Sequence, residues 1–352
     1  MRVAPCSSSA STNARPMPRL APVTNATDIL GTMTHNDALT DVLDLLRVRG
    51  AVMAYVRAGA PWGLQLPRAP GATFHAVTTG VCWVRVPGHA PRELLPGDIV
   101  LLPTGTSHIV ASHASGPARA WDRVAKARAR NAAGEIVLPG RGGATHLICA
   151  SYDYDRDVVH PLLSLLPPVL VIPSDESAAA RGALAMLHHE LTTSSAGSAI
   201  IVDRLIDVLL VHVVRAWVAR QEDRGRSWLV GLRSPSVARA LAIIHAAPGE
   251  PWTVDRLARE SNLSRASLTR HFTSLVGEPP LAYLTRWRME LAARQLRETD
   301  DPIGAIAHRV GYTSEFAFSR AFSRARGRPP GRYRAAEQER RESTPRLRRD
   351  EP

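Results

Sequence analysis

The sequence predicts an α+β protein with two domains, an N-terminal β-barrel with flanking helices and a C-terminal all-α domain with two helix-turn-helix motifs joined by a connecting helix. Three observations predict this arrangement. Short β-type runs separated by Gly and Pro fill residues 51–153, helical periodicity returns from Pro173, and the stretch Thr253–Gly327 carries nearly the same pattern twice. The 352 residues are enough for two to three domains of roughly 150 residues each.

Residues 1–34 are predicted to be a disordered leader. The stretch is rich in Ser, Ala, Thr and Pro and has no acidic residue before Asp28, so it buries too little apolar surface to offset the entropy of ordering. Two other interpretations stay open. The first is an organelle transit peptide, because such peptides are also poor in acidic residues, although this leader shows little amphipathic order. The second is that translation starts at Met33, so that the leader is not part of the protein. Asp37–Leu43 is expected to form a short capped amphipathic helix.

The segment 35–172 is predicted to be the β-barrel domain. Many short strands with Gly and Pro between them are typical of a sandwich or barrel. The polar, basic stretch His113–Gly143 is predicted to be a long loop. The strands are expected at Ala51–Val56, Thr73–Val77, Val81–Val86, Ile99–Leu102 and Leu147–Tyr152.

One phrase within this domain is more specific. Gly97–His108 matches the second sequence motif of cupin barrels, with Gly, Pro, Gly and His at the expected spacing, so the domain resembles a cupin. The first cupin motif is poorly kept, because His75 stands where a His-x-His pair would supply two ligands but its partner position is Val77. A cupin metal site needs three or four side-chain ligands, and only His75 and His108 stand in suitable places. We therefore expect no metal and no cofactor, with these histidines hydrogen-bonded or lining a pocket.

Residues 173–222 are predicted to form two helices, Ser177–Leu191 and Ala199–Ala219, followed by a linker at 223–235. Two roles for the helices stay open: they form a homodimer, or they pack against their own barrel. The longest apolar stretch, 199–219, is broken by four charged residues, so no membrane span is expected.

The C-terminal domain, predicted at 236–335, has two halves that each follow the helix-turn-helix pattern. Asn262 and Gly311 occupy the two turns, and these are residue types that reach a positive φ at low cost. Ser264 and Ser314 stand where a side-chain oxygen caps the second helix of each motif. The apolar positions are Val254, Leu257, Ala258, Leu268 and Phe272 in the first half and Ile303, Ile306, Ala307, Phe318 and Phe322 in the second.

A connecting helix is predicted between the halves at Leu281–Glu298, after Pro279 and Pro280. Its apolar face is expected to contain Leu281, Leu284, Trp287 and Leu291. A helix of about 18 residues is roughly 27 Å long, and successive major-groove faces of DNA lie about 34 Å apart. The charged residues 336–352 are predicted to be a disordered tail.

The charge of the chain favours a polyanionic partner, because the net charge is +12. Arginine pairs bidentately with guanine or phosphate, although basic helix faces are also often just solvated. The three cysteines, Cys6, Cys82 and Cys149, are scattered, which indicates a reducing compartment and no metal cluster. Basic faces are expected on the second helix of each motif, where they are exposed, and on the connecting helix, and their arginines are Arg265, Arg270, Arg286, Arg288, Arg294, Arg297, Arg320, Arg324 and Arg326.

About 100 residues at the C-terminal end resemble the AraC/XylS family of transcriptional regulators. The resemblance implies that the second helix of each motif enters the major groove, with Ala266, Thr269 and Arg270 facing bases in the first motif and Glu315, Phe316, Ser319 and Arg320 in the second. Ala266 departs from the larger residues of the family. Arg265, Ser267, Arg288 and Arg324 complete the predicted DNA-binding set. The matching residues include Leu257-Ala258, Leu263-Ser264, Gly277, Tyr283-Leu284, Arg288-Met289, Ile306-Ala307, Val310-Gly311-Tyr312, Phe318-Ser319-Arg320 and Pro329-Pro330.

Family members often carry a cupin-like sensing domain, and Gly59–Leu64 and Pro96–Asp98 resemble one such subfamily. This resemblance implies an effector pocket lined by Trp62, His75, Trp83 and His108.

The predicted function is a sequence-specific DNA-binding transcriptional regulator controlled by a small molecule, and not an enzyme. Its expected partners are double-stranded promoter or operator DNA, an unidentified effector, a second copy of the chain and, for an activator, RNA polymerase. The expected location is the bacterial cytoplasm, on the nucleoid. The first alternative, a metal-dependent cupin enzyme fused to a DNA-binding region, needs a complete metal triad. The second, a DNA-repair methyltransferase, needs a zinc-bound cysteine cluster that three dispersed cysteines cannot build.

Overall fold

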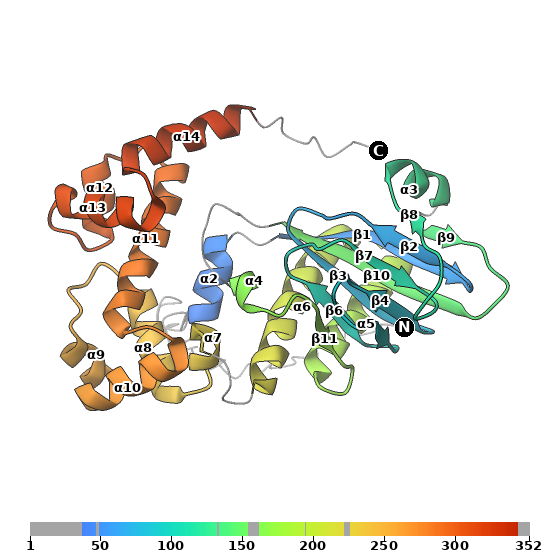
Figure 1. The fold of residues 1–352 in the computed structure, drawn as a ribbon, viewed down its shortest axis with the longest axis horizontal. Helices are drawn as coiled ribbons and strands as arrows, with labels where there is room; N and C mark the ends of the chain where they lie inside the picture. Colours follow the sequence, from blue (N-terminus) through green and yellow to red (C-terminus); the bar gives the residue numbers. More distant parts are fainter. Residues whose placement is uncertain are drawn as a thin grey trace, which may run out of the picture. The chain divides into compact units, whose positions relative to one another are not determined.

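The computed structural model describes residues 37–46, 49–131, 134–153, 162–193, 195–221 and 226–343. The predicted leader 1–34, with Met33, lies outside these described residues. The N-terminal half contains β1 Arg49–Gly59, β2 Gly63–Leu66, β3 Ala72–Thr79, β4 Cys82–Arg85, β5 Arg92–Leu94, β6 Ile99–Leu102, β7 His108–Ala111, β8 Arg119–Ala120, β9 Ile136–Leu138, β10 Ala144–Asp153 and β11 Leu170–Ile172, with helices α2 Ala38–Leu46, α3 Arg123–Ala129, α4 Leu162–Leu165, α5 Ala178–Thr193 and α6 Ser198–Arg220 (Figure 1).

The strands pair as two sheets. One has six strands in the order β11-β6-β3-β10-β1-β9, and the other has five in the order β5-β4-β7-β2-β8. Most pairs are antiparallel, whereas β1 with β9 and β2 with β8 are parallel. The predicted β-domain is therefore confirmed as a double sheet, but within the described residues no strand pairing closes the two sheets into one continuous barrel.

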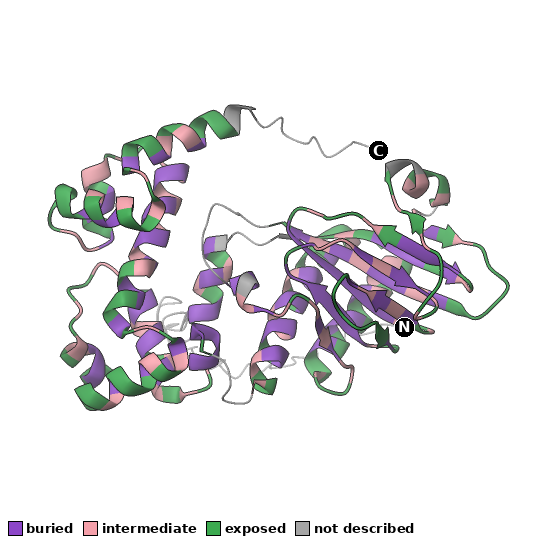
Figure 2. Ribbon diagram, viewed as in Figure 1, coloured by how far each residue is buried: buried purple, intermediate pink, exposed green. Residues whose placement is uncertain are grey.

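The six-stranded sheet is buried on both faces. Its inner face contributes Val77, Val100 and Leu147 to a core shared with Val84 and Val110 of the other sheet. Its outer face packs against α6, where the hydroxyl of Tyr152 donates to the carbonyl oxygen of Ile206 at 2.8 Å. Burial on both sides explains why β6 is a continuous apolar run and why the first six residues of β3 are all buried, Thr73 and His75 included (Figure 2).

Helix α6 lies so close to the six-stranded sheet that Gly50 of β1, which faces α6, has no room for a side chain. A Cβ at Gly50 would lie 1.9 Å from Cγ2 of Ile206, and the amide of Gly50 donates to Oδ1 of Asp207 at 2.9 Å. Helix α6 therefore packs against the sheet of its own chain, as one of the two alternatives predicted. None of the described helices is both long and apolar enough to cross a membrane.

The five predicted strands are present, but the stretch 113–143 is not a plain loop, which corrects that prediction. It contains β8, α3 and β9. Helix α3 begins after Asp122, whose carboxylate accepts from the amide of Ala125 at 2.8 Å. The strands that the sequence analysis did not predict have two to four residues each, which is too short for a period-2 pattern to be recognised.

The C-terminal half is all helical, as predicted. Its turns have the predicted geometry, with φ of 57° at Asn262 and 84° at Gly311. Ser264 and Ser314 cap the helices that follow by accepting from the amides of Ser267 and Ala317. The helices are α7 Trp228–Gly231, α8 Pro235–Ala246, α9 Val254–Glu260, α10 Arg265–Val276, α11 Pro280–Glu298, α12 Ile303–Arg309, α13 Glu315–Arg326 and α14 Pro330–Ser343.

Three predictions about this half need correction. The linker predicted at 223–235 contains α7, which is buried, and the amide of Ser227 donates to the carbonyl oxygen of Leu275 at 2.8 Å. The tail predicted from residue 336 is helical to Ser343, because Tyr333 and Glu337 are buried and hold α14 in place. The connecting helix does not bury Leu281, which is 37% exposed; Tyr283, with no exposed surface, is buried instead.

Candidate nucleic-acid interface

The second helix of each motif is positioned by a pair of buried aromatic or aliphatic residues. In α10 these are Leu268 and Phe272, and in α13 they are Phe318 and Phe322, all with 0% exposure. Both helices have 12 residues and end at a left-handed glycine, Gly277 with φ 93° and Gly327 with φ 72°. Helices α10 and α13 therefore share the same length, the same capping and the same buried face, in agreement with the repeat in the sequence.

The opposite faces of α10 and α13 carry most of the predicted DNA-binding residues. Ser267 and Ser319 are half-buried. Phe316 is 72% exposed, and the guanidinium carbon of Arg320 lies 5.7 Å from the centre of its ring, so these two side chains lie on the same side of α13. The exposed residues are Arg265, Ala266, Thr269 and Arg270 on α10 and Glu315, Phe316, Arg320 and Arg324 on α13.

Arg288 on α11 is half-buried and differs from the rest of the predicted set. Its Nε donates to the carbonyl oxygen of Pro248 at 2.7 Å, and its Nη2 donates to that of Glu250 at 2.8 Å. Its guanidinium carbon lies 5.9 Å from the ring centre of Tyr312. Arg288 therefore contacts the segment before the first motif's helix α9 and the turn of the second motif at the same time.

A chain of hydrogen bonds links the two predicted histidines inside the N-terminal half. Nδ1 of His108 lies 2.7 Å from the carbonyl oxygen of Thr106, so it carries a proton and donates it, which leaves Nε2 of that ring as an acceptor. This Nε2 lies 2.7 Å from Nε2 of His75, which therefore donates. Nδ1 of His75 then accepts from the thiol of Cys149 at 3.1 Å. Each atom has one role, and both imidazoles are neutral.

Burial favours these neutral forms. It lowers the pKa of His75 well below its ordinary value, and a charge on His108 would lower it further. Burial also lowers the pKa of His108, against the opposite effect of the Thr106 carbonyl, and raises the pKa of the Cys149 thiol to about 12. Among the described residues, no three His, Cys, Asp or Glu side chains are grouped so that they could hold a metal ion.

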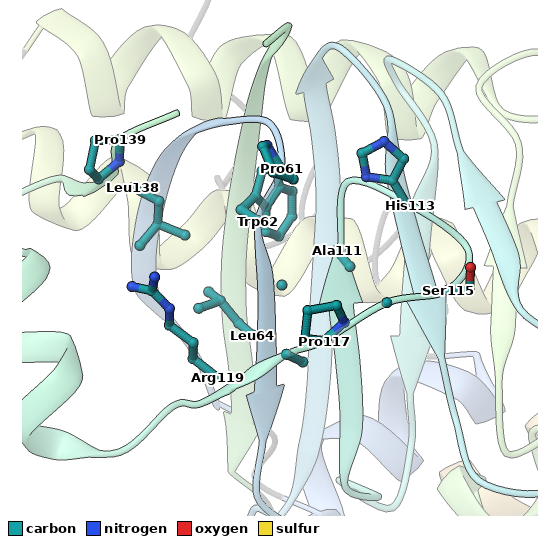
Figure 3. Close-up of a pocket in the computed structure, with 13 residues that line it drawn as sticks. Pro61, Trp62, Leu64, Ala111, His113, Ser115, Pro117, Arg119, Leu138 and Pro139 are labelled. Carbon is teal, nitrogen blue, oxygen red and sulfur yellow. The ribbon is translucent and has the colours of Figure 1, made fainter. Parts of the chain in front are cut away.

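A cavity of about 330 Å³ lies where the segments after β1, β7 and β9 meet (Figure 3). Trp62, Leu64, Pro117 and Leu138 give it a mainly apolar lining, and Arg119 lies beside them. The sequence did not predict that Pro117 and Arg119 line a cavity, because their positions depend on the pairing of Leu64 in β2 with Arg119 in β8.

None of the cavities found among the described residues is lined by all four predicted effector-binding residues. Only Trp62 lines the cavity in Figure 3. His108 lines a second cavity of about 270 Å³, and His75 is fully buried. Trp83 is half-buried and, because side chains alternate along a strand, lies on the face of β4 opposite the buried Cys82 and Val84.

Comparison with known proteins identifies the family. A family model described as Cupin matches residues 37–219, and one described as Helix-turn-helix domain matches residues 257–336. A putative AraC-like transcription regulator of Streptomyces antibioticus is 38% identical over 309 residues, which cover 85% of this chain and 98% of that relative. The chain belongs to the family of AraC-like transcription regulators.

Two further proteins are similar to this AraC-like regulator. The HTH-type transcriptional regulator AlkR of Acinetobacter baylyi is 31% identical over 304 residues, covering 85% of this chain and 99% of AlkR. Among solved structures, the DNA-binding domain of AdpA in complex with a target DNA is 34% identical and covers 31% of this chain and 98% of that one, with a TM-score of 0.30. The chain is accordingly a sequence-specific DNA-binding transcriptional regulator with an N-terminal cupin domain.

The neutral histidine chain makes the stability of this AraC-like regulator depend on pH. The unfolded chain protonates His75 and His108 near pH 6.5, whereas the folded chain resists protonation to lower pH. The free energy of unfolding should therefore fall as the pH drops below about 6.5, by up to roughly 1.4 kcal/mol per pH unit for each group. Denaturant unfolding between pH 5 and 8 measures this slope.

A double variant tests the assignment of that slope. His75→Leu with His108→Leu should reduce the slope of the free energy of unfolding against pH below about 6.5, whereas the exposed His113→Gln should leave it unchanged. An equal slope in the wild type and the double variant would show that other groups cause it.

Proposed function

We propose that this regulator binds its operator by placing α10 and α13 in successive major grooves, under the control of a small molecule bound in the N-terminal half. One observation carries the first part. Arg270 and Arg320 each lie two residues before a fully buried phenylalanine, Phe272 or Phe322, and both arginines are exposed. The two buried phenylalanines therefore hold the two arginines at equivalent positions of α10 and α13, and an arginine can form a bidentate contact with guanine.

The exposed face of α13 supports base contact. An aromatic ring that is 72% exposed, as Phe316 is, has much apolar surface in water. Contact with a thymine methyl group would cover it. Glu315 and Ser319 on the same helix add a carboxylate and a hydroxyl for base edges. On α10, Ser267 and Thr269 offer hydroxyl groups and Ala266 offers a methyl group. We assign Arg265 and Arg324 to the flanking phosphates.

The length of the connecting helix supports two neighbouring grooves. Helix α11 has 19 residues, which corresponds to roughly 28 Å. Successive major-groove faces lie about 34 Å apart, and modest bending of the DNA closes the remaining distance.

DNA binding should weaken steeply with salt, because arginine contacts release counterions from phosphates. With six or more such contacts, we expect the affinity of the full chain for its operator to fall by about 10³-fold or more between 50 and 200 mM salt. Arg324→Gln should reduce the slope of log Kobs against log salt by about 0.9. The control Arg68→Gln replaces an exposed arginine between β2 and β3 and should leave the slope unchanged. A salt-independent affinity would rule out this mode of binding.

The cavity beside Trp62 supports control by a small molecule. Its volume of about 330 Å³ and mainly apolar lining suit a compact organic ligand, with Arg119 available to an anionic group. We propose that binding there shifts the protein between DNA-binding states. His75 and His108 would support the fold of the domain around this ligand.

The surface of α5 and α6 supports a homodimer. Met186, Ile200, Ile201 and Val208 are exposed by 40% to 70%, and a second copy of the chain would cover them. We further propose that the regulator acts on the bacterial nucleoid in the cytoplasm, has no enzymatic activity and, at promoters that it activates, contacts RNA polymerase. The regulator relatives support this over a cupin enzyme fused to a DNA-binding region.

A further inference from the structure

The connecting helix joins two separate hydrophobic cores. Tyr283, Leu284 and Trp287 belong to a core that contains the first motif and extends into the N-terminal half. Met289, Ala292, Ala293 and Leu296 belong to the core of the second motif. Arg288 lies between Trp287 and Met289, at the boundary of the two cores. A covalent helix alone can bend, so the relative orientation of α10 and α13 depends on what else joins the motifs here.

A direct contact between the motifs lies at this boundary. A Cβ at Gly311 would lie 2.5 Å from Nη2 of Arg288 and 2.6 Å from the carbonyl oxygen of Gly249. A Cβ at Gly249 would lie 2.8 Å from the carbonyl oxygen of Arg309. The loop between α8 and α9 thus touches the turn between α12 and α13, and neither backbone leaves room for a side chain.

Arg288 connects both sides of this contact. Its two hydrogen bonds hold the carbonyl groups of Pro248 and Glu250 in the first motif, and its guanidinium lies against Gly311 and Tyr312 of the second. One planar group with several fixed donors can hold two backbone carbonyls at once, whereas a lysine acts as a point charge. We define Arg288, Gly249 and Gly311 as the inter-motif joint.

We propose that the inter-motif joint sets the spacing and rotational phase of the two half-sites that the protein accepts, with Arg288 as its positioning residue. This inference rests on the proposed docking of α10 and α13. A rotation of about 10° at one end of a rod of roughly 28 Å moves the other end by about 5 Å, which exceeds the rise of about 3.4 Å per base pair. A loosened joint would therefore tolerate the gain or loss of a base pair between half-sites.

The test uses the full chain and DNA duplexes derived from the sequence that the wild type selects from a randomised library. One duplex keeps the selected spacing, and two others have one base pair inserted or removed between the half-sites. In Arg288→Ala and Arg288→Lys, the affinity penalty for altered spacing should fall by at least about fivefold. Base preference within each half-site should stay the same.

A second variant distinguishes a role of Arg288 in the inter-motif joint from a role as a phosphate contact. Gly249→Ala removes no charge and opens the same joint from the first motif, so it should loosen the spacing requirement as Arg288→Ala does. If Arg288→Lys behaves as wild type, or if Arg288→Ala weakens all three duplexes alike and lowers the salt slope by about 0.9, Arg288 is a phosphate contact and the inference is wrong. If the wild type selects no sequence with two half-sites, the proposed docking fails instead.

Discussion

Replacing Arg326 with methionine is expected to destabilise the second helix-turn-helix motif by about 3–5 kcal/mol. Arg326 lies at the end of α13 and forms an ion pair with Glu290 of α11, and both side chains are only 4% exposed. Burial raises the pKa of Glu290, and Arg326 opposes this effect. The variant leaves a buried carboxylate without this partner, which is far more costly than losing an exposed ion pair. Thermal and denaturant unfolding measure the loss.

The pH dependence of this variant has a definite sign. Without Arg326, the pKa of Glu290 in the folded chain lies above its unfolded value, because burial then acts with less opposition. The folded chain therefore gains stability from protonation at low pH, and this is lost as the pH rises through the folded pKa. The deficit of Arg326→Met against the wild type should be larger at pH 8 than at pH 5.

Two further variants show whether the buried charge is the cause. The double variant Glu290→Met with Arg326→Met should recover most of the loss, because two apolar side chains replace the pair. Arg324→Met, on the exposed face of the same helix, should change stability by no more than about 0.5 kcal/mol. A double variant as unstable as Arg326→Met would contradict the explanation.

The parts of the fold that local chemistry determines were predictable from the sequence. The turn residues Asn262 and Gly311, the caps Ser264 and Ser314 and the helix after Pro280 act through their immediate neighbours in the chain. Repetition of the same pattern in two halves strengthened each assignment. The same holds for the five predicted strands, which have four or more residues.

The parts that depend on distant contacts were not predictable. The sequence of α7 was interpreted as a linker because its four residues are buried only through tertiary packing, against α10 and α8. The role of Arg288 depends on Pro248 and Glu250, about 40 residues earlier. Strand alternation turns Trp83 away from the buried face of its strand, and the cavity beside Trp62 is lined in part by the segment predicted to be a loop.

Arg270→Ala and Arg320→Ala are each expected to weaken operator binding by about 1–3 kcal/mol, or roughly 5- to 150-fold. The loss of a bidentate base contact relaxes preference at one position, whereas the loss of a phosphate contact weakens all sequences alike. Because Phe272 and Phe322 fix the two arginines in equivalent places, the two variants should relax different half-sites. The exposed Arg332→Ala on α14 provides a control that should keep the full base preference.

The most direct test of two recognition helices in successive grooves is selection of bound sequences from a randomised DNA library by the wild type, Arg270→Ala and Arg320→Ala. The wild type should select two half-sites about one helical turn apart, roughly 10 base pairs. Each variant should lose base preference in one half-site and keep it in the other. Variants that retain the full wild-type preference in both half-sites, at reduced affinity, would contradict the account.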